Sequence, residues 1–157
     1  MKNLIAFFAL FVACISGFAA DLSITATSFV PSTKAKYFTG VAGATITAGQ
    51  PVCYNATTKR YVLADADGSG LTNVEGLAAN GAAAGQPLRI VTEDPELILG
   101  ATLSMTAPVY VLSGTAGGIA PTADIGTGEY PIVLLVATST TTCILKPRAL
   151  QGTAAAQ

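Results

Sequence analysis

A ten-residue pattern occurs twice in this chain and constrains its fold more than any other feature. Residues 43–52 read GATITAGQPV and residues 100–109 read GATLSMTAPV, with identical residues at five positions. Each copy opens a stretch of short apolar runs separated by Gly, Asn, Asp and Pro. A unit that is used twice and carries few reactive side chains is typical of a binding or building block. We therefore predict one domain, residues 21–147, with repeat units at about 43–92 and 100–147.

The apolar residues of this domain follow the period of β-strands. Leu22, Ile24 and Ala26 alternate with polar residues, which predicts a first strand within 21–30 with one face buried. The same reasoning predicts strands at 34–39, 45–48, 51–55, 60–65, 73–79, 87–92, 97–104, 107–112, 130–137 and 143–147. No window of twelve residues shows a clean helical apolar face. The fold class is therefore all-β, a small β-barrel or sandwich built from two similar β units. The acidic run 93–96 is expected to mark the boundary between the units.

Residues 1–20 form a separate, signal-like hydrophobic segment. Lys2 is followed by an apolar run over 4–12, and Gly17 and Ala19 supply small residues for cleavage after Ala19. The run is short for a membrane span, so none is expected in the mature chain. Lipidation at Cys14, retention as a hydrophobic arm, and a start placed too far upstream are alternatives to secretion. The tail, residues 148–157, is expected to be flexible.

The chain is poor in charge. Of its 157 residues, 11% are charged and 51% are hydrophobic, and the net charge is −1. Average proteins carry about 25% charged residues, so Thr, Ser, Ala and Gly must form much of this surface. Such a surface costs little to desolvate, which favours a place inside an assembly over the alternative of an ordinary globular protein with biased composition. The basic residues are scattered, so nucleic acid is not expected as a partner.

The sequence offers little catalytic chemistry. It contains no His, the commonest general base. Residues 65–70 resemble the front of a calcium loop, but Gly76 stands where the bidentate Glu is needed. We expect no enzyme activity, no cofactor and no metal. Cys53 and Cys143 lie in apolar runs and are expected to be buried free thiols, or a disulfide if the protein is exported.

Several segments resemble small virion proteins of tailed phages. They are ADLSITAT at 20–27, the repeat at 43–52, YVLADAD at 61–67, NGAAAGQP at 80–87 and VYVLSGTAGGIAP at 109–121. The resemblance is to head decoration or capsid cement proteins, sometimes called head fiber proteins. It implies a β-rich module that docks outside an assembled shell and stabilises it, with no catalytic residues to carry over. Residues 1–19 depart from that family, whose members start near the position of Ala20.

The expected function is therefore that of a structural virion protein on the capsid exterior. Its partners would be the major capsid protein and further copies of itself, a trimer being one option. The expected contacts are an exposed first strand, which could extend a neighbouring sheet, and the loop near 115–121. The residues concerned are Leu22, Ile24, Phe29, Val30, Thr115, Ile119 and Pro121. The alternative is a secreted or surface-attached bacterial β module, an adhesin or pilus-like subunit, in the periplasm or at the cell surface if residues 1–20 work as a signal peptide.

Overall fold

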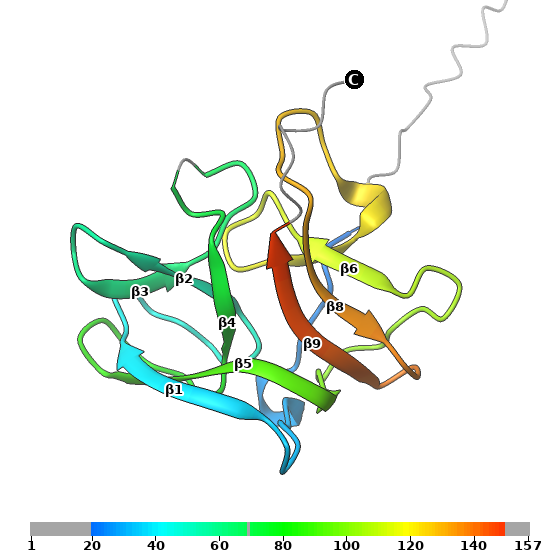
Figure 1. The fold of residues 1–157 in the computed structure, drawn as a ribbon, viewed down its shortest axis with the longest axis horizontal. Coiled ribbons are helices and arrows are strands. Elements are labelled where there is room, and N and C mark those ends of the chain that lie inside the picture. The colour runs from blue at the N-terminus through cyan, green and yellow to red at the C-terminus, as the bar shows by residue number, and fades with distance from the viewer. Residues whose placement is uncertain (1–19, 69, 150–157) are drawn as a thin grey trace, which may run out of the picture.

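The computed structural model describes residues 20–68 and 70–149, and these are nearly all β (Figure 1). The expectations for residues 1–19 and 150–157 lie outside the described residues. The strands are β1 (Lys36–Val41), β2 (Pro51–Asn55), β3 (Arg60–Leu63), β4 (Val74–Ala78), β5 (Pro87–Ile98), β6 (Val109–Leu112), β7 (Ile119–Pro121), β8 (Ile132–Ala137) and β9 (Thr142–Ala149). Two 3₁₀ turns, η1 (Ala26–Ser28) and η2 (Thr122–Asp124), complete the regular structure. Within the described ranges no helix is long and apolar enough to cross a membrane. The all-β prediction is confirmed.

The repeat in sequence corresponds to a repeat in topology. The strands form one curled antiparallel sheet in the order β3-β2-β4-β5-β9-β8-β6-β7, with β1 also paired to β5. In the first unit β2 pairs with β3 and β4, and β4 pairs with β5. In the second unit β6 pairs with β7 and β8, and β8 pairs with β9. The prediction of two similar β units therefore describes the pairing of the strands as well as their sequence.

Strand β5 belongs to both units. The two copies of the repeat are offset by the distance from Gly43 to Gly100. When the residues of β1 are shifted along the sequence by that offset, they correspond to residues 93–98, the second half of β5. The equivalence holds in the pairing, because β1 pairs with the first half of β5 and the second half of β5 pairs with β9. The acidic run 93–96 lies inside this strand, where the pairing with β1 ends at Glu93 and the pairing with β9 begins at Asp94. Its backbone continues the ladder from one unit into the next.

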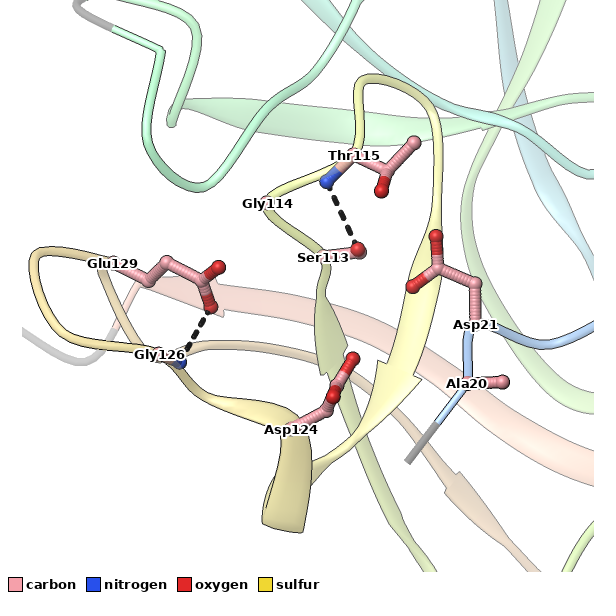
Figure 2. A pocket seen from close by; sticks show the side chains of 8 residues that line it. All are labelled: Ala20, Asp21, Ser113, Gly114, Thr115, Asp124, Gly126 and Glu129. Carbon is pink, nitrogen blue, oxygen red and sulfur yellow. Dashed lines mark hydrogen bonds between the residues drawn. The ribbon is translucent and has the colours of Figure 1, made fainter. Parts of the chain in front are cut away.

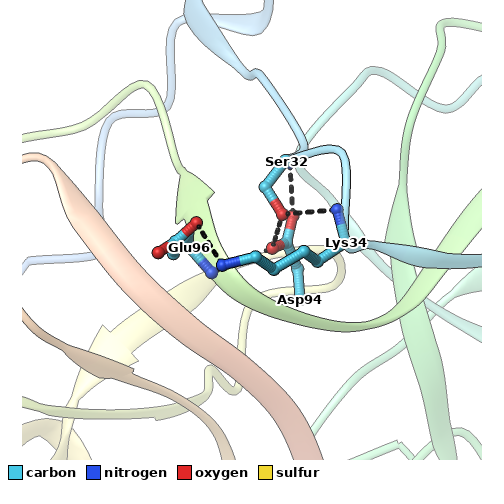
Figure 3. A network of polar contacts seen from close by, with 4 residues as sticks. All are labelled: Ser32, Lys34, Asp94 and Glu96. Atoms are coloured by element: carbon cyan, nitrogen blue, oxygen red, sulfur yellow. Dashed lines mark hydrogen bonds and ion pairs between the residues drawn. The ribbon is translucent and has the colours of Figure 1, made fainter.

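Asp94 explains why this acidic run can lie inside a strand (Figure 3). Its side chain is 1% exposed and accepts hydrogen bonds from Ser32 N at 2.7 Å and Ser32 Oγ at 2.5 Å. It also accepts one from Glu96 N at 2.9 Å. A buried carboxylate is tolerated when its lone pairs are occupied in this way. Asp94 therefore attaches the turn before β1 to β5.

The first unit curls until its first and third strands meet. Residue 42 forms a parallel bridge with Tyr61, and Gly43 N donates to Tyr61 O at 2.7 Å. The small core inside this unit consists of Ala42, Ile46, Val52, Ala78, Ala82, Leu88 and Ile90. On β2, Val52 points into this core and the next residue, Cys53, points into a larger one. This central strand is therefore buried on both faces.

The larger core joins the two units. Its buried members include Cys53, Leu77 and Val91 from the first unit and Leu112, Leu135 and Cys143 from the second, together with Phe29. Because this one apolar cluster contains side chains from both repeats, each repeat depends on the other to complete its hydrophobic core.

Residues 21–30 do not form the expected strand. Leu22 N donates to Ile119 O at 2.7 Å, Thr25 N donates to Gly100 O at 2.9 Å, and Val30 bridges Ile98. The segment passes from β7 to the end of β5, so it cannot keep a ladder with one neighbour, and it turns at η1 between them. It thereby fills the seam of the second unit, the gap between β7 and the end of β5. The first unit has no such gap, because the end of β1 contacts β3 directly.

Other boundaries also differ from the expectations. Residues 45–48 and 101–104 are not strands, since Ile46 only bridges Ala82 and Leu103 N bonds Thr140 O. Residues 119–128, where no strand was predicted, contain β7 and η2, because Ile119 and the following Ala are buried beside β6. Strand β9 continues to Ala149, past the predicted start of the tail. In each case the bonds supplied by a distant segment decided the outcome.

Candidate interaction surface

Exposed aliphatic side chains gather on one face of the second unit. Val30, Ile98, Val136 and Ile144 are 50%, 41%, 39% and 43% exposed. Val136 and Ile144 are direct cross-strand partners on β8 and β9, and Val30 bridges Ile98 at the end of β5. Ile98 in turn pairs with Thr142, two residues before Ile144 on β9. These four residues therefore share one side of adjoining strands, and we call them the outer apolar face.

The face exists because these strands alternate. On β9, Cys143 and Leu145 are buried in the core, so Ile144 between them points outward. On β8, Leu135 and Ala137 are buried and Val136 points outward. An aliphatic residue at an outward position gains nothing from the chain's own core, and several of them side by side are typical of an interaction site.

Charges border this face on one side. A groove of about 330 Å³ is lined by Lys34, Lys36, Glu93, Asp94, Pro95, Ile144, Leu145 and Lys146. Lys34 Nζ lies 3.2 Å from Glu96 Oε2, and Lys36 Nζ lies 2.6 Å from Glu93 Oε2. Lys146 Nζ lies 3.8 Å from Glu93 Oε1. These exposed pairs add little stability, but they leave a border in which positive and negative groups balance locally.

Of the seven predicted contact residues, two are buried and three are half-buried in this chain's own fold. Phe29 is 7% exposed and Ile119 is 0% exposed, while Leu22 and Ile24 are half-buried against the larger core. The expectation of an exposed first strand is therefore wrong, because the segment closes the second unit's seam. Thr115 is exposed and Pro121 is half-buried. Val30 alone of the seven belongs to the outer apolar face.

Sequence reasoning missed Ile98, Val136 and Ile144. They sit in runs such as LLVA and CILK, in which nearly every residue is apolar. Such runs do not show which alternate residues face outward, because both sets are aliphatic. The signal became visible only when the strand register was known.

Cys53 and Cys143 are buried and free, which confirms the expectation of buried free thiols over that of a disulfide. Cys143 Sγ donates to Leu97 O at 3.6 Å. Burial raises the pKa of Cys53 to about 11 and that of Cys143 to about 12. A thiol with such a pKa is protonated and unreactive at neutral pH.

A second pocket lies at the turn that follows β6, beside η2 and the loop that precedes β8 (Figure 2). Its volume is about 320 Å³, and its lining residues are Ala20, Asp21, Ser113, Gly114, Thr115, Asp124, Gly126 and Glu129. Glu129 Oε2 accepts a hydrogen bond from Gly126 N at 2.9 Å. Burial, and then the negative charge of Asp21, raises the pKa of Asp124. Across residues 20–68 and 70–149, no three His, Cys, Asp or Glu side chains are placed to hold a metal ion.

Comparison with protein-family models and with curated proteins finds no match.

Proposed function

We propose that this protein is a non-catalytic structural module that binds the exterior of a phage capsid through its outer apolar face and stabilises the shell. The observation that carries the proposal is the placement of Val30, Ile98, Val136 and Ile144 on one side of adjoining strands. The resemblance of segments such as 43–52 and 109–121 to decoration proteins supplies the identity of the partner.

The energetics suit repeated docking. Covering an exposed aliphatic side chain contributes about 1–2 kcal/mol, and little ionic hydration is lost at a surface with few charges. The locally balanced pairs Lys34–Glu96 and Lys36–Glu93 reduce the charge that a partner must meet. An interface of about 800 Å² per partner is ordinary for a specific complex. Symmetry then repeats it over the shell.

A secreted or surface-attached bacterial β module is the second candidate. The observation that favours it is the signal-like pattern of residues 1–20. The outer apolar face would then dock on a neighbouring subunit at the cell surface. Material that is found on cells and absent from particles would favour this candidate.

The test is co-sedimentation of the purified protein with capsids that lack it. We expect saturable binding and a higher temperature of shell disruption. The double variant Val136→Glu, Ile144→Glu should bind at least tenfold more weakly, because two buried charges would be left unpaired. Val41→Glu is the matched control, since Val41 is 42% exposed on β1 of the other unit. Absence of binding by the unaltered protein would refute the capsid role.

A further inference from the structure

The doubled topology puts residues of the two units at equivalent positions. The pairing of β2 with β4 contains a bulge, and the pairing of β6 with β8 contains one at the same place. When the two bulges are matched, Leu77 on β4 corresponds to Val136 on β8. Their cross-strand partners, Val91 on β5 and Ile144 on β9, correspond as well. The outer apolar face of the second unit therefore has a counterpart on the first.

In the first unit this counterpart is covered by the second unit. Leu77 and Val91 are both 0% exposed. They lie in the larger core together with Leu112 and Ile119 from the second unit. The outer apolar face thus repeats a surface that the chain buries within itself, but in the second unit that surface is left without a cover.

The side chains that provide the cover also have uncovered equivalents. Leu112 on β6 and Ile119 on β7 are cross-strand partners, and the same register on β2 and β3 pairs Tyr54 with Tyr61. Tyr54 is 41% exposed and Tyr61 is half-buried. Their ring centroids are 5.4 Å apart, and the ring of Phe38 on β1 lies 5.3 Å from that of Tyr61. We call Phe38, Tyr54 and Tyr61 the aromatic patch.

The two uncovered surfaces carry opposite charges. Glu75 is the extra residue of the bulge on β4, and its Oε2 accepts a hydrogen bond from Tyr61 Oη at 3.2 Å. Among the side chains that the structure describes, none forms an ion pair with Glu75. On β9, Lys146 lies two residues after Ile144, on the same side of the strand, and is exposed. Its Nζ lies 3.8 Å from Glu93 Oε1, while Oε2 of that carboxylate binds another lysine at 2.6 Å.

We propose that the aromatic patch of one copy of this chain docks on the outer apolar face of the next copy, with Glu75 beside Lys146. The contact repeats between chains the packing of the second unit on the first within a chain. Tyrosine suits this position because its ring covers aliphatic side chains, while its hydroxyl is hydrated when the copies are apart. The two surfaces differ, so copies associate head to tail, in a ring or in an open string.

One copy can use both surfaces at the same time. In the sheet, β2 and β3 lie on one side of β4, while β8 and β9 lie on the other (Figure 1). A copy that binds a shell through its outer apolar face, as proposed above, still presents its aromatic patch to a further copy. The inference goes beyond the proposed function and does not require it, because copies can associate without a shell.

The first test is the mass of the purified protein, measured by sedimentation equilibrium over a wide range of concentrations. We expect the mean mass to rise with concentration from that of one chain. Tyr54→Ser should abolish this rise, because it deletes the exposed ring of the aromatic patch. Tyr130→Ser is the matched control, since Tyr130 is 44% exposed in the loop before β8 and belongs to neither surface. The proposal is overturned by a wild type that stays a single chain, or by a Tyr54→Ser variant that associates like the wild type.

The second test exchanges the charges. Glu75→Lys and Lys146→Glu should each weaken the association at least about tenfold when studied alone, because like charges then meet. A mixture of the two variants should associate again, since every contact between unlike variants pairs a lysine with a glutamate. The melting temperature of each variant checks its folding. A mixture that associates as weakly as the single variants contradicts the docking of the patch on the face.

Binding to capsids that lack the protein separates this inference from the proposed function. Tyr54→Ser leaves the outer apolar face intact, so we expect it to bind such capsids without adding further copies. Capsid binding by a wild type that does not associate in solution would refute the head-to-tail contact alone. Association in solution without capsid binding would support this contact and refute the capsid role.

Discussion

At the scale of single residues, Gly76 shows how closely β4 and β5 approach. A Cβ atom added there would lie 2.2 Å from Val91 O and 2.8 Å from Ile90 Cγ2. The first of these atoms belongs to the backbone, which cannot move away without distorting the ladder. The glycine that interrupts an otherwise strand-like run is thus required by the packing of two strands.

Gly76→Ala is expected to lower the free energy of unfolding by about 3 kcal/mol, because the strands must separate to admit the methyl group. Gly81→Ala is the matched control. It is exposed, and its added Cβ would meet only Ile46 O at 3.8 Å. Urea denaturation should show a change within about 0.5 kcal/mol for the control. Similar values for the two variants would contradict the close approach.

The buried thiols make stability depend on pH. Burial holds the pKa of Cys143 at about 12, above its ordinary value of 9.0, so above pH 9 the unfolded chain loses a proton that the native chain keeps. Stability therefore falls as pH rises from about 9, by up to about 1.4 kcal/mol per pH unit for each such thiol.

Cys143→Ala should remove that part of the pH dependence. Between pH 7.5 and pH 10 the wild type should lose about 1 kcal/mol more stability than the variant, as measured by urea denaturation. Cys143→Ala is expected to be less stable than the wild type at every pH. The two proteins are therefore compared by how steeply the free energy of unfolding falls with pH. Parallel slopes would show that Cys143 ionises as readily in the folded protein as in the unfolded one.

At the scale of elements, the N-terminal segment changes role between sequence and structure. Phe29 and Val30 are neighbours, yet Phe29 is 7% exposed in the larger core and Val30 is 50% exposed on the outer apolar face. The segment therefore stabilises the chain's own second unit with the Phe29 side chain and exposes the Val30 side chain on the outer apolar face.

Phe29→Ala is expected to cost about 3–4 kcal/mol, because it leaves a cavity in the shared core. Val30→Ala should change the free energy of unfolding by less than about 0.5 kcal/mol. Thermal and urea denaturation of both variants will measure the contrast. A small effect of Phe29→Ala would mean that the segment leaves the seam readily.

At the scale of the whole molecule, the two units are joined too closely to act alone. Strand β5 completes the first and begins the second, and the larger core takes Leu77 from one and Leu135 from the other. A domain in which the main core is shared has no internal boundary at which unfolding could stop.

We expect a single cooperative transition. The calorimetric enthalpy of unfolding should equal the van't Hoff enthalpy, as it does for two-state domains. Gly76→Ala in the first unit should lower the melting temperature of the whole chain without splitting the transition. Two separate heat-absorption peaks would show that the repeats fold independently.

The sequence predicted a large part of this fold. The strands at β2, β3, β4, β6 and β8 lie where alternation and apolar runs placed them, and the repeat at 43–52 and 100–109 anticipated the doubled topology. Local pattern was sufficient there because β2, β4, β6 and β8 each have a ladder partner on both sides, while β3 follows its partner β2 through a short turn. It failed at 21–30, where the alternation of Leu22 and Ile24 is real but the partners change along the segment.

The outer apolar face was much less predictable. A short all-aliphatic run shows that a strand is buried on at least one side, but not which residues lie on that side. Ile144 and Leu145 are equivalent in sequence, yet one is 43% exposed and the other 1%. Only the register of β9 against β8 and β5 distinguishes them.

Residue types and their spacing determined that this chain is all-β, duplicated and poor in charge, because strand periodicity and turn residues act over a few positions. The tertiary structure decided how β5 is shared, where residues 21–30 lie and which aliphatic side chains face outward. Those outcomes depend on hydrogen bonds and contacts between segments far apart in the chain, and no local pattern records which distant partner will be met.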